Sequence, residues 1–593
     1  MSYALARARG QILSLLTSQN LELAESEIRE AAPGHEADLA VPLFRLAREL
    51  SQDPALLARS IVSQLSLEGT MFASVRAEGG YLNFRFRPEA LCQEVVSDFS
   101  RNPEGYGRSE VGRGRTIVID FSSPNIAKPF SVGHLRSTII GQALHNIFSW
   151  LGYRVIGDNH LGDWGTQFGK LLCAYELWGS EAELNRNPTS HLLELYVRFH
   201  QEADAEGGTR KAEGGMSLEA RAREWFRRLE QGDPAARSRW EQFVALSTRE
   251  FNRIYELLGV RFDVTLGESF YSDRLEGVVR RALERGVARR EKPLAAARGS
   301  DEDVRPDETV VLIPLDEQGI AVPLILQKSD GTSLYATREL ATAEYRIETW
   351  HPERILYVVG KEQEFYFRQF SAAMKLLGHD VPCIHVSFGL IRLPQGRIST
   401  RQGRVILLED VINEAISRAA AVVTDRELSA EEKAEISRKV GIGAIKYADL
   451  SQSRIKEVVF DWDRMLSLDG DSAPYLQYAY TRTRAILRKA GTTQPPAPPT
   501  AWPQLTSEEL PLLKHIAAFP DSIVAAAESY EPHRIANRLY RLAQDFSLFY
   551  DRVPVLRAET PQLRSARLYL VEMVGTVLRL GLGLLGIEVA ERM

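Results

Sequence analysis

The chain has 593 residues, 26% of them charged and 44% hydrophobic, and its 73 Lys and Arg against 79 Asp and Glu leave a net charge of −6. This composition excludes a collagen, a disulfide scaffold and a wholly disordered chain, and the length predicts several domains because single cores rarely grow beyond about 300 residues. The acidic balance argues against a protein that coats nucleic acid indiscriminately, although a local basic surface is compatible with it.

Cysteine usage and hydropathy indicate the compartment. The three cysteines, Cys92, Cys173 and Cys383, are far apart and odd in number, so they offer neither a disulfide framework nor a zinc-binding pair. The opening MSYALARARGQILSLL is not a secretory signal, and no run approaches the roughly 18 apolar residues that span a bilayer. We therefore expect a cytoplasmic, multidomain enzyme without a structural metal and without a membrane partner.

Residues 1–112 are predicted to form a small α+β domain. Apolar residues recur at helical spacing in ALARARGQILSLLTSQ and in PLFRLARELSQDPALLARSIVSQL, whereas GGYLNFRF alternates apolar and polar residues as a strand does. The segment 101–115 is rich in Gly, Pro and Arg, which is typical of a linker.

From Arg115 onward, short apolar strands alternate with helices. The strand TIVID, the strand and loop RVIGDNHLG, and the strands in ERILYVVG and CIHVSFG alternate with helices and predict a doubly wound parallel sheet whose ligands bind beyond the carboxyl ends of the strands. About 170 residues separate the two halves of this pattern, which indicates an insertion within about 186–325. Its charged stretch 186–256 is interpreted as solvated helix faces.

After Asp410 the chain is predicted to be helical, and its charge is unevenly distributed. The proline-rich GTTQPPAPPTAWP cannot continue a helix and is predicted to be a loop. Residues 475–593 hold 14 Lys and Arg against 11 Asp and Glu, a net +3, whereas residues 1–112 hold 11 against 15, a net −4. Positive charge at the C-terminal end suits a docking face for a polyanion.

The segment DFSSPNIAKPFSVGHLRST, residues 120–138, joins a predicted strand to a predicted helix. Free backbone N–H groups and the helix dipole favour a phosphate at such a place. Gly133 would let the backbone approach a ligand, His134 would donate to phosphate oxygens, and Lys128 would add a mobile cation. The alternative is an ordinary strand–helix turn with an N-cap serine.

The segment LPQGRISTRQGRV carries two hydroxyls, Ser399 and Thr400, among the cations Arg397, Arg401 and Arg404. Such a flexible basic loop suits a reaction in which negative charge develops on a leaving pyrophosphate. An exposed basic turn without function is the alternative.

A third segment, KSDGTSLYATRELA, places Tyr335 and Glu339 four residues apart. In a helix they share one face, where a carboxylate would pair with a cationic substrate. A surface glutamate is the alternative interpretation.

Taken together, these segments resemble one known family. PNIAKPFSVGH resembles the ATP-binding motif of class I aminoacyl-tRNA synthetases, and GRISTRQG is similar to the mobile loop of the arginyl-tRNA synthetases. DNHLGDWGTQFGKLL, SDGTSLYATRELA and the terminal GLLGIEVAERM also match that family, in the right order and over essentially the whole chain. The resemblance implies a Rossmann-like doubly wound catalytic domain at 113–415, a tRNA-contacting α+β domain at 1–112, a helical stem-contact region at 416–474 and a helical anticodon-binding domain at 475–593.

The resemblance also implies an activity and its residues. The reaction is ATP-dependent ligation of L-arginine to tRNA(Arg) through an arginyl-adenylate, by a monomer, with Mg²⁺ arriving on ATP. Arginine would be bound by Asp120, Ser122, Asn125, His160, Tyr335, Glu339 and Gln363. ATP would be bound by Pro124, Ser131, Val132, Gly133, His134, Arg397, Ile398, Ser399, Thr400 and Arg401, with catalytic roles for Lys128, His134, Arg397 and Ser399.

The C-terminal segment PYLQYAYTRTRAILRKAG combines cations with aromatic rings. Arg482, Arg484 and Arg488 lie at helical spacing, and Tyr478 lies beside them, so the segment is predicted to bind tRNA by phosphate contacts and base stacking. A core helix with buried tyrosines and solvated arginines is the alternative.

Four residues depart from the family pattern: Ser131, Arg397, Glu339 and Tyr366 stand where the family usually has His, Lys, Asp and His. Two rival functions therefore stay open at this point. One is a paralogue with an altered pocket, which tolerates an inhibitor or uses another amino acid. The other is a catalytically weak tRNA-binding protein.

Overall fold

The computed structural model describes residues 2–32, 35–126, 128–208, 216–292, 309–329, 331–393, 396–397, 406–423, 425, 427–491, 495–499, 502 and 505–593. The chain forms two compact units. The first, called the helical unit below, comprises residues 1–110, 423–440 and 467–593. The second, called the sheet unit, comprises residues 111–422 and 441–466.

The N-terminal part of the helical unit is the predicted α+β domain. Its antiparallel sheet has the order β1 (Arg29–Glu30), β2 (Leu39–Pro42), β4 (Tyr81–Phe86), β3 (Phe72–Glu78). Leu82, Phe84 and Phe86 of β4 are buried, because alternate side chains of a strand face the same core. The helices around this sheet are α1 (Ala4–Thr17), α2 (Phe44–Glu49), α3 (Pro54–Gln64) and α4 (Pro88–Arg101).

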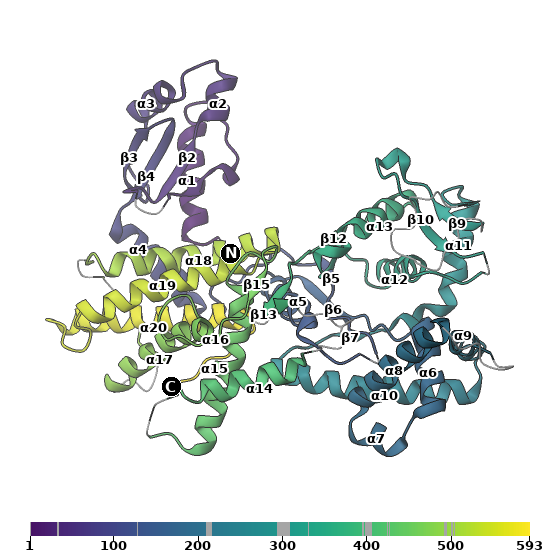
Figure 1. Cartoon of the computed structure of the whole chain (residues 1–593). Coiled ribbons are helices and arrows are strands. Elements are labelled where there is room, and N and C mark those ends of the chain that lie inside the picture. The colour runs from purple at the N-terminus through teal and green to yellow at the C-terminus, as the bar shows by residue number, and fades with distance from the viewer. Residues whose placement is uncertain are drawn as a thin grey trace. The chain divides into compact units, whose positions relative to one another are not determined.

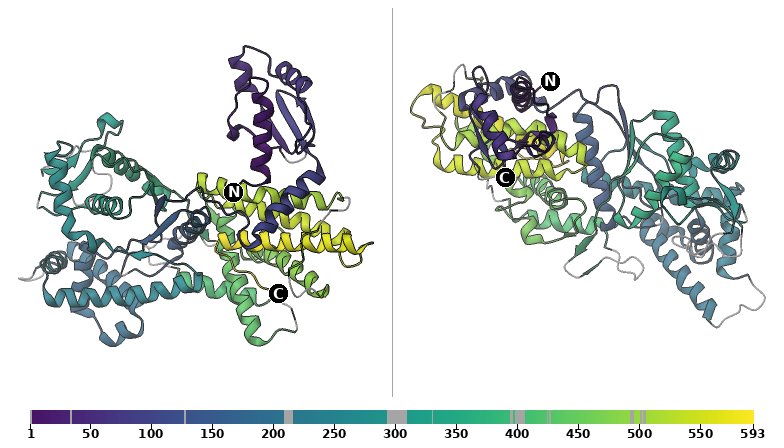
Figure 2. Two further views of the ribbon diagram at one scale, coloured as in Figure 1. Left: turned by 180° about the vertical axis from the view of Figure 1, so that it is seen from behind. Right: turned by 90° about the horizontal axis from the view of Figure 1, so that it is seen from above.

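Long helices form the rest of the helical unit, as Figure 1 shows in green and yellow. They are α17 (Ala473–Lys489), α18 (Glu509–Ser529), α19 (His533–Arg552) and α20 (Pro561–Leu584). Both views of Figure 2 show α18, α19 and α20 side by side. Among the described residues, α18 alone is long and apolar enough to cross a membrane, but 61% of its most apolar window is buried, as in the core helix of a globular domain.

The core of the sheet unit is a parallel sheet, which confirms the predicted doubly wound fold. Its order is β12 (Cys383–His385), β11 (Arg354–Tyr357), β5 (Thr116–Asp120), β6 (Arg154–Asn159), β7 (Val264–Thr265). The apolar strand TIVID becomes the central strand β5, hydrogen-bonded on both sides, because a strand buried on both faces needs a continuous apolar run. Helices α5 (Val132–Trp150) and α13 (Glu364–Leu376) connect successive strands.

The insertion after β6 is mostly helical. It contains α6 (Thr166–Trp178), α7 (Glu181–Arg186), α8 (Pro188–Gly208), α9 (Leu218–Glu230), α10 (Pro234–Leu258), η3 (Glu268–Arg274) and α11 (Leu275–Glu284). An antiparallel sheet of β8 (Arg289–Glu291), β9 (Val310–Ile313) and β10 (Leu324–Gln327) follows, and then α12 (Tyr335–Trp350). A small sheet of β13 (Ile391–Leu393), β14 (Gly396–Arg397) and β15 (Val458–Val459), with α14 (Leu408–Ala419), α15 (Ala430–Leu450) and α16 (Trp462–Met465), completes the described elements used below.

Candidate active site

A cavity of about 460 Å³ opens at the carboxyl ends of β5, β6 and β11. The strand order changes direction at β5, which pairs with β6 on one side and β11 on the other, and such a point leaves a crevice for ligands. The cavity brings together nine predicted residues: Asp120, Ser122, Asn125, Gly133, His134, His160, Tyr335, Glu339 and Gln363. The predicted Pro124, Lys128, Ser131 and Val132 belong to the same strand–helix segment but are not part of the cavity lining.

The turn after β5 holds an unusual backbone. Ser122 and Ser123 have φ values of 69° and 45°, a left-handed conformation that side chains other than glycine rarely adopt. The Ser122 N–H donates to Ser137 Oγ at 2.9 Å, and the Ser122 hydroxyl lies 2.8 Å from Thr138 Oγ1 and 2.9 Å from the Tyr255 hydroxyl. These bonds to α5 and α10 hold the turn in place, so Ser122 shapes the cavity wall.

Asn125 occupies its position because Gly162 leaves room for it. The two residues form a parallel bridge, and a Cβ atom built on Gly162 would lie 2.0 Å from Asn125 Oδ1. Any side chain at position 162 would therefore displace the Asn125 amide from the cavity. Gly133 differs, since among the described residues a Cβ atom there would meet Ser131 Oγ alone, at 3.3 Å. The open space in front of Gly133 is available to a ligand.

His134 presents a neutral imidazole to the cavity. Burial lowers its pKa to about 4, and the positive charge of Lys128 adds to this effect. The Ser131 N–H donates to Nδ1 at 3.1 Å, so the ring proton is assigned to Nε2. Phe130 stacks on the imidazole at a centroid distance of 5.1 Å and fixes its plane. The Nε2–H group is thus a donor for an oxygen atom of an anionic ligand.

The predicted mobile loop ends beside this turn. Residues on its C-terminal side bond to the turn, since the Val132 N–H donates to the Ile406 carbonyl at 3.2 Å and the Leu408 N–H to the Phe130 carbonyl at 3.0 Å. Arg397 lies in β14 and pairs with Arg392 of β13. The predicted Ile398, Ser399, Thr400 and Arg401 lie outside the described residues.

A buried arginine of α5 holds the base of the same loop. Arg136, 1% exposed, binds both carboxylate oxygens of Asp449 at 2.8 and 2.9 Å. It also donates to the carbonyls of Gly389, at 2.6 Å, and Lys456, at 2.8 Å, which precede β13 and β15. Because β13 pairs with both β14 and β15, Arg136 attaches the strands that carry the loop to the helix that carries His134.

The other end of the cavity is acidic. Glu339, 3% exposed, accepts a hydrogen bond from the Tyr335 hydroxyl, and its Oε1 lies 3.8 Å from His160 Nε2. Burial, together with the charge of Asp120, raises the pKa of Glu339 well above its usual range. His160 donates from Nδ1 to the Leu266 carbonyl at 3.0 Å, and burial lowers its pKa to about 4, so Nε2 is an acceptor.

A second carboxylate, Glu268 at the start of η3, lines the same acidic end. It is 8% exposed and lies 2.8 Å from Arg338 Nε. Burial raises its pKa to about 7, although the charge of Arg338 opposes that shift. Sequence reasoning missed Glu268, because no motif surrounds it and it comes from the insertion.

Asp120 is already paired within the protein. Arg346, which is completely buried, donates from Nη2 to Asp120 Oδ2 and to Asp158 Oδ2, both at 2.7 Å. Asp120 Oδ1 accepts from the Ser123 hydroxyl at 2.7 Å. A faint signal for Arg346 exists in the sequence, since it follows Glu339 by seven residues and so lies on the same face of α12.

In the helical unit, the predicted tRNA-binding residues of α17 have different environments. Arg482 lies between two rings, with its guanidinium carbon 4.6 Å from the Tyr478 centroid and 5.0 Å from that of Tyr550. Arg484 instead pairs with Glu572 at 3.0 Å, and both side chains are largely buried. Arg488 is exposed and donates to the Glu591 carbonyl at 2.9 Å.

Family models match almost the whole chain. Residues 101–462 match the catalytic domain of the class I tRNA synthetases for arginine, residues 4–86 the arginyl-tRNA synthetase N-terminal domain, and residues 476–593 the DALR anticodon-binding domain.

Curated relatives and a solved structure agree with these models. An arginine–tRNA ligase of Chloroflexus aurantiacus is 41% identical and covers 100% of both chains, and one of Halothermothrix orenii is 39% identical over 98% of this chain and 99% of its own. The Thermus thermophilus arginyl-tRNA synthetase structure matches with a TM-score of 0.79 and 25% identity, over 99% of each chain. The chain therefore belongs to the arginyl-tRNA synthetases of class I, the family that its sequence motifs resemble.

Proposed function

We propose that the cavity of the sheet unit joins L-arginine to ATP as arginyl-adenylate and then transfers the arginyl group to the terminal adenosine of tRNA(Arg). One observation carries this proposal: the His134 end, suited to phosphate, and the Glu339 end, suited to a cation, belong to a single cavity. Positioning two substrates in one site is the main requirement of such a reaction, because effective concentration supplies much of the rate.

The acidic end receives the guanidinium group. Glu339 and Glu268 offer two carboxylates, which suit the fork of N–H donors of a guanidinium, and Tyr335 adds a ring wall that is 38% exposed. Arg346 already binds Asp120. The remaining acceptor positions of Asp120, together with the side-chain oxygens of Asn125 and Gln363, accept hydrogen bonds from the α-ammonium group of arginine. Glu339 is one methylene longer than the Asp that the family usually has at this position, but its carboxylate still lies in this pocket. This position of the carboxylate favours arginine over a different amino acid.

The other end receives MgATP. The base lies over Gly133, and the phosphates lie near the His134 Nε2–H group, with Lys128 and the loop 397–401 as additional cations. A carboxylate oxygen of arginine attacks the α-phosphorus, the bond from that phosphorus to the bridging oxygen breaks, and pyrophosphate leaves with the electron pair. The donors around the phosphates stabilise the charge that develops on this leaving group.

The helical unit binds the tRNA. Arg482, a half-buried cation between Tyr478 and Tyr550, suits an unpaired base or a backbone phosphate, and it belongs to the part of the chain with net positive charge. We propose that residues 475–593 bind the anticodon, residues 416–474 the stem and residues 1–112 another part of the tRNA. We further propose that the enzyme acts in the cytoplasm and that it acts as a monomer. Sedimentation at assay concentrations measures the oligomeric state.

Arginine-dependent ATP–pyrophosphate exchange, with and without tRNA(Arg), tests this function. Exchange with arginine supports the proposal, and its dependence on tRNA shows whether this enzyme needs tRNA before it activates the amino acid. Exchange only with an arginine analogue indicates a paralogue with an altered pocket. Binding of tRNA without any exchange indicates a tRNA-binding protein, and either of these last results contradicts the proposal.

A further inference from the structure

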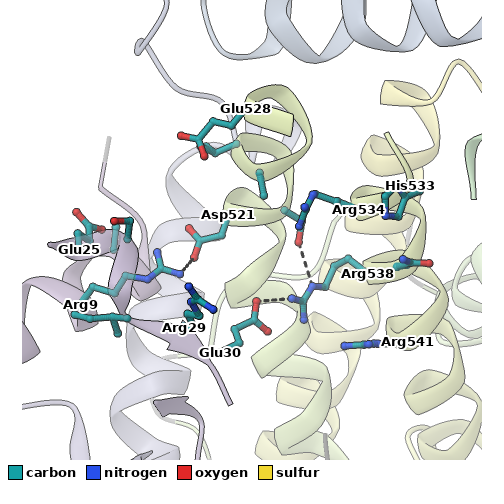
Figure 3. A pocket seen from close by; sticks show the side chains of 17 residues that line it. Arg9, Glu25, Arg29, Glu30, Asp521, Glu528, His533, Arg534, Arg538 and Arg541 are labelled. Carbon is teal, nitrogen blue, oxygen red and sulfur yellow. Dashed lines mark hydrogen bonds and ion pairs between the residues drawn. The ribbon is translucent and has the colours of Figure 1, made fainter. Parts of the chain in front are cut away.

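Two kinds of polar contact join distant segments within the units. In the helical unit, Arg538 of α19 binds Glu30 of β1 at 2.5 Å. Arg9 of α1 likewise pairs with Asp521 of α18, and Figure 3 marks both ion pairs with dashed lines. In the sheet unit, a neutral group, the hydroxyl of Tyr255 on α10, joins the insertion to the turn after β5. Such neutral hydrogen bonds are directional, so they fix the orientation of their partners.

The Tyr255 hydroxyl belongs to a chain of four hydrogen bonds. Asn159 at the end of β6 donates from Nδ2 to the Tyr255 oxygen at 3.3 Å, and that oxygen lies 2.9 Å from Ser122 Oγ. Ser122 Oγ lies 2.8 Å from Thr138 Oγ1, and the Thr138 hydroxyl donates to the His134 carbonyl at 2.7 Å. The chain therefore runs from the parallel sheet, through the insertion and the turn, to the helix that carries His134.

The last member of the chain fixes the direction of every proton in it. A carbonyl oxygen only accepts, so the Thr138 hydroxyl proton points to His134, and Thr138 Oγ1 accepts from Ser122. The single hydroxyl proton of Ser122 is then in use, so Ser122 Oγ accepts from Tyr255, whose oxygen accepts from the Asn159 amide. Burial raises the pKa of Tyr255, which keeps this proton on the oxygen. Hydrogen bonds aligned in one direction also strengthen one another.

The chain stabilises the left-handed turn at the arginine end of the cavity. Backbone conformations such as those of Ser122 and Ser123 persist only where surrounding contacts hold them. The turn leads from Asp120 to Asn125, which both line the cavity, and the Ser123 hydroxyl donates to Asp120 Oδ1 at 2.7 Å. Relaxation of the turn would therefore displace acceptors that we assign to the α-ammonium group of arginine.

The ring of Tyr255 acts on the other end of the cavity. It meets the Phe130 ring edge to face, with centroids 5.3 Å apart and ring planes at 87°. Phe130 in turn stacks on the His134 imidazole, with the two planes at 26°. Phe262 also contacts the Tyr255 ring, at a centroid distance of 4.8 Å. The plane of the imidazole, and with it the direction of its Nε2–H bond, thus depends on the Tyr255 ring and not on its hydroxyl.

We propose that Tyr255 is a positioning residue for the synthesis of arginyl-adenylate. Its hydroxyl holds the Ser122 turn at the arginine end, and its ring holds Phe130 against His134 at the ATP end. The inference rests on the proposed function, which supplies both substrates, and it assigns a task in the reaction to the insertion. Tyr255, 3% exposed, is an exception to the solvated helix faces predicted for residues 186–256.

Two substitutions separate the hydroxyl from the ring, with arginine-dependent ATP–pyrophosphate exchange by the full-length protein at saturating tRNA(Arg) as the assay. Tyr255→Phe loses only the hydroxyl, so the KM for arginine should rise about tenfold and the KM for ATP should stay nearly unchanged. Tyr255→Leu also loses the ring, so it should raise the KM for ATP and lower kcat as well. The matched control is Tyr175→Phe, which removes from the same insertion a hydroxyl that donates to Glu181 at 2.5 Å. It should keep both wild-type KM values.

A double-mutant cycle with Ser122→Ala tests whether the Tyr255 hydroxyl acts through Ser122. The two effects on the KM for arginine should be non-additive, so the double variant should resemble Ser122→Ala alone. Additive effects would overturn the inference, and so would an equal rise of both KM values in Tyr255→Phe. A lower melting temperature of Tyr255→Phe with both KM values unchanged would show a merely structural role. Failure of the proposed function is distinguishable, because wild-type protein would then show no arginine-dependent exchange.

Discussion

At the scale of single residues, the acidic end of the catalytic cavity predicts a pH-dependent affinity for arginine. Glu268, with a pKa of about 7, and Glu339, with a raised pKa, both carry protons in part of the free enzyme near neutral pH. Arginine binds the ionised carboxylates, so binding releases protons and tightens as the pH rises. The KM for arginine should fall between about pH 6 and pH 8, whereas the KM for ATP should change little.

The matched variant for this prediction is Glu339→Gln. It should raise the KM for arginine by about 100-fold, because a buried charge pair is lost, and it should flatten the pH dependence that remains. A KM for arginine that is independent of pH in wild type would show that neither carboxylate binds the guanidinium.

Gly162 and Gly133 line the same cavity region but are glycine for different reasons: Gly162 leaves room for a protein side chain, and Gly133 leaves room for a ligand. Gly162→Ala places a methyl group against Asn125 Oδ1 and should lower the free energy of unfolding by about 1–3 kcal/mol together with arginine binding. Among the described residues, Gly133→Ala meets Ser131 Oγ alone, at 3.3 Å, so it should leave stability nearly unchanged and raise the KM for ATP. Urea unfolding and substrate titrations measure both. Equal stability losses in the two variants would contradict this distinction.

Not every residue of the site could be predicted from the sequence. His134, Gly133, Tyr335 and Glu339 lie in motifs or at helical spacing, so local pattern was enough. Glu268 and Arg346 could not be predicted from a local pattern. The position of Glu268 depends on how the insertion folds against the parallel sheet, and that of Arg346 on how α12 packs against β5 and β6. An isolated Arg in a helix is normally interpreted as solvated, and only the tertiary structure shows that Arg346 pairs with two buried carboxylates.

At the scale of elements, α17 allows a test of which of its arginines binds tRNA. Arg482→Gln should raise the KM for tRNA and leave stability nearly unchanged, because in the described part of the chain Arg482 contacts two aromatic rings and has no carboxylate partner. Arg484→Gln should lower the free energy of unfolding, since Glu572 would keep a largely buried charge without its partner. Thermal unfolding and tRNA titration distinguish the two. An unchanged KM for tRNA in Arg482→Gln would exclude this surface.

The elements themselves followed well from local patterns, for identifiable reasons. The continuous apolar run of TIVID and the helical spacing after Ser131 predicted β5 and α5 within a few residues. The order of strands across the sheet does not follow from such patterns, because β11 joins β5 from a distance of more than two hundred residues. Handedness and crossover rules restrict that order but do not select it.

At the scale of the whole molecule, the chain divides into two units to which we assign different tasks. The sheet unit contains the cavity proposed for arginine and ATP, and the helical unit contains the surfaces proposed for tRNA. The overall charge of −6 conceals this division, because the positive charge is concentrated in the C-terminal helices. The prediction that specific RNA contacts lie in the C-terminal helices rests on this uneven charge.

We propose that arginine and ATP occupy one cavity, side by side. Inhibition by a non-hydrolysable arginyl-sulfamoyl adenosine, which joins both substrates in one molecule, tests it most directly. We expect competitive inhibition against arginine and also against ATP, with an affinity much higher than that for either substrate, because one ligand then fills both ends of the site. Competition against only one of the two substrates would show that arginine and ATP do not share this cavity.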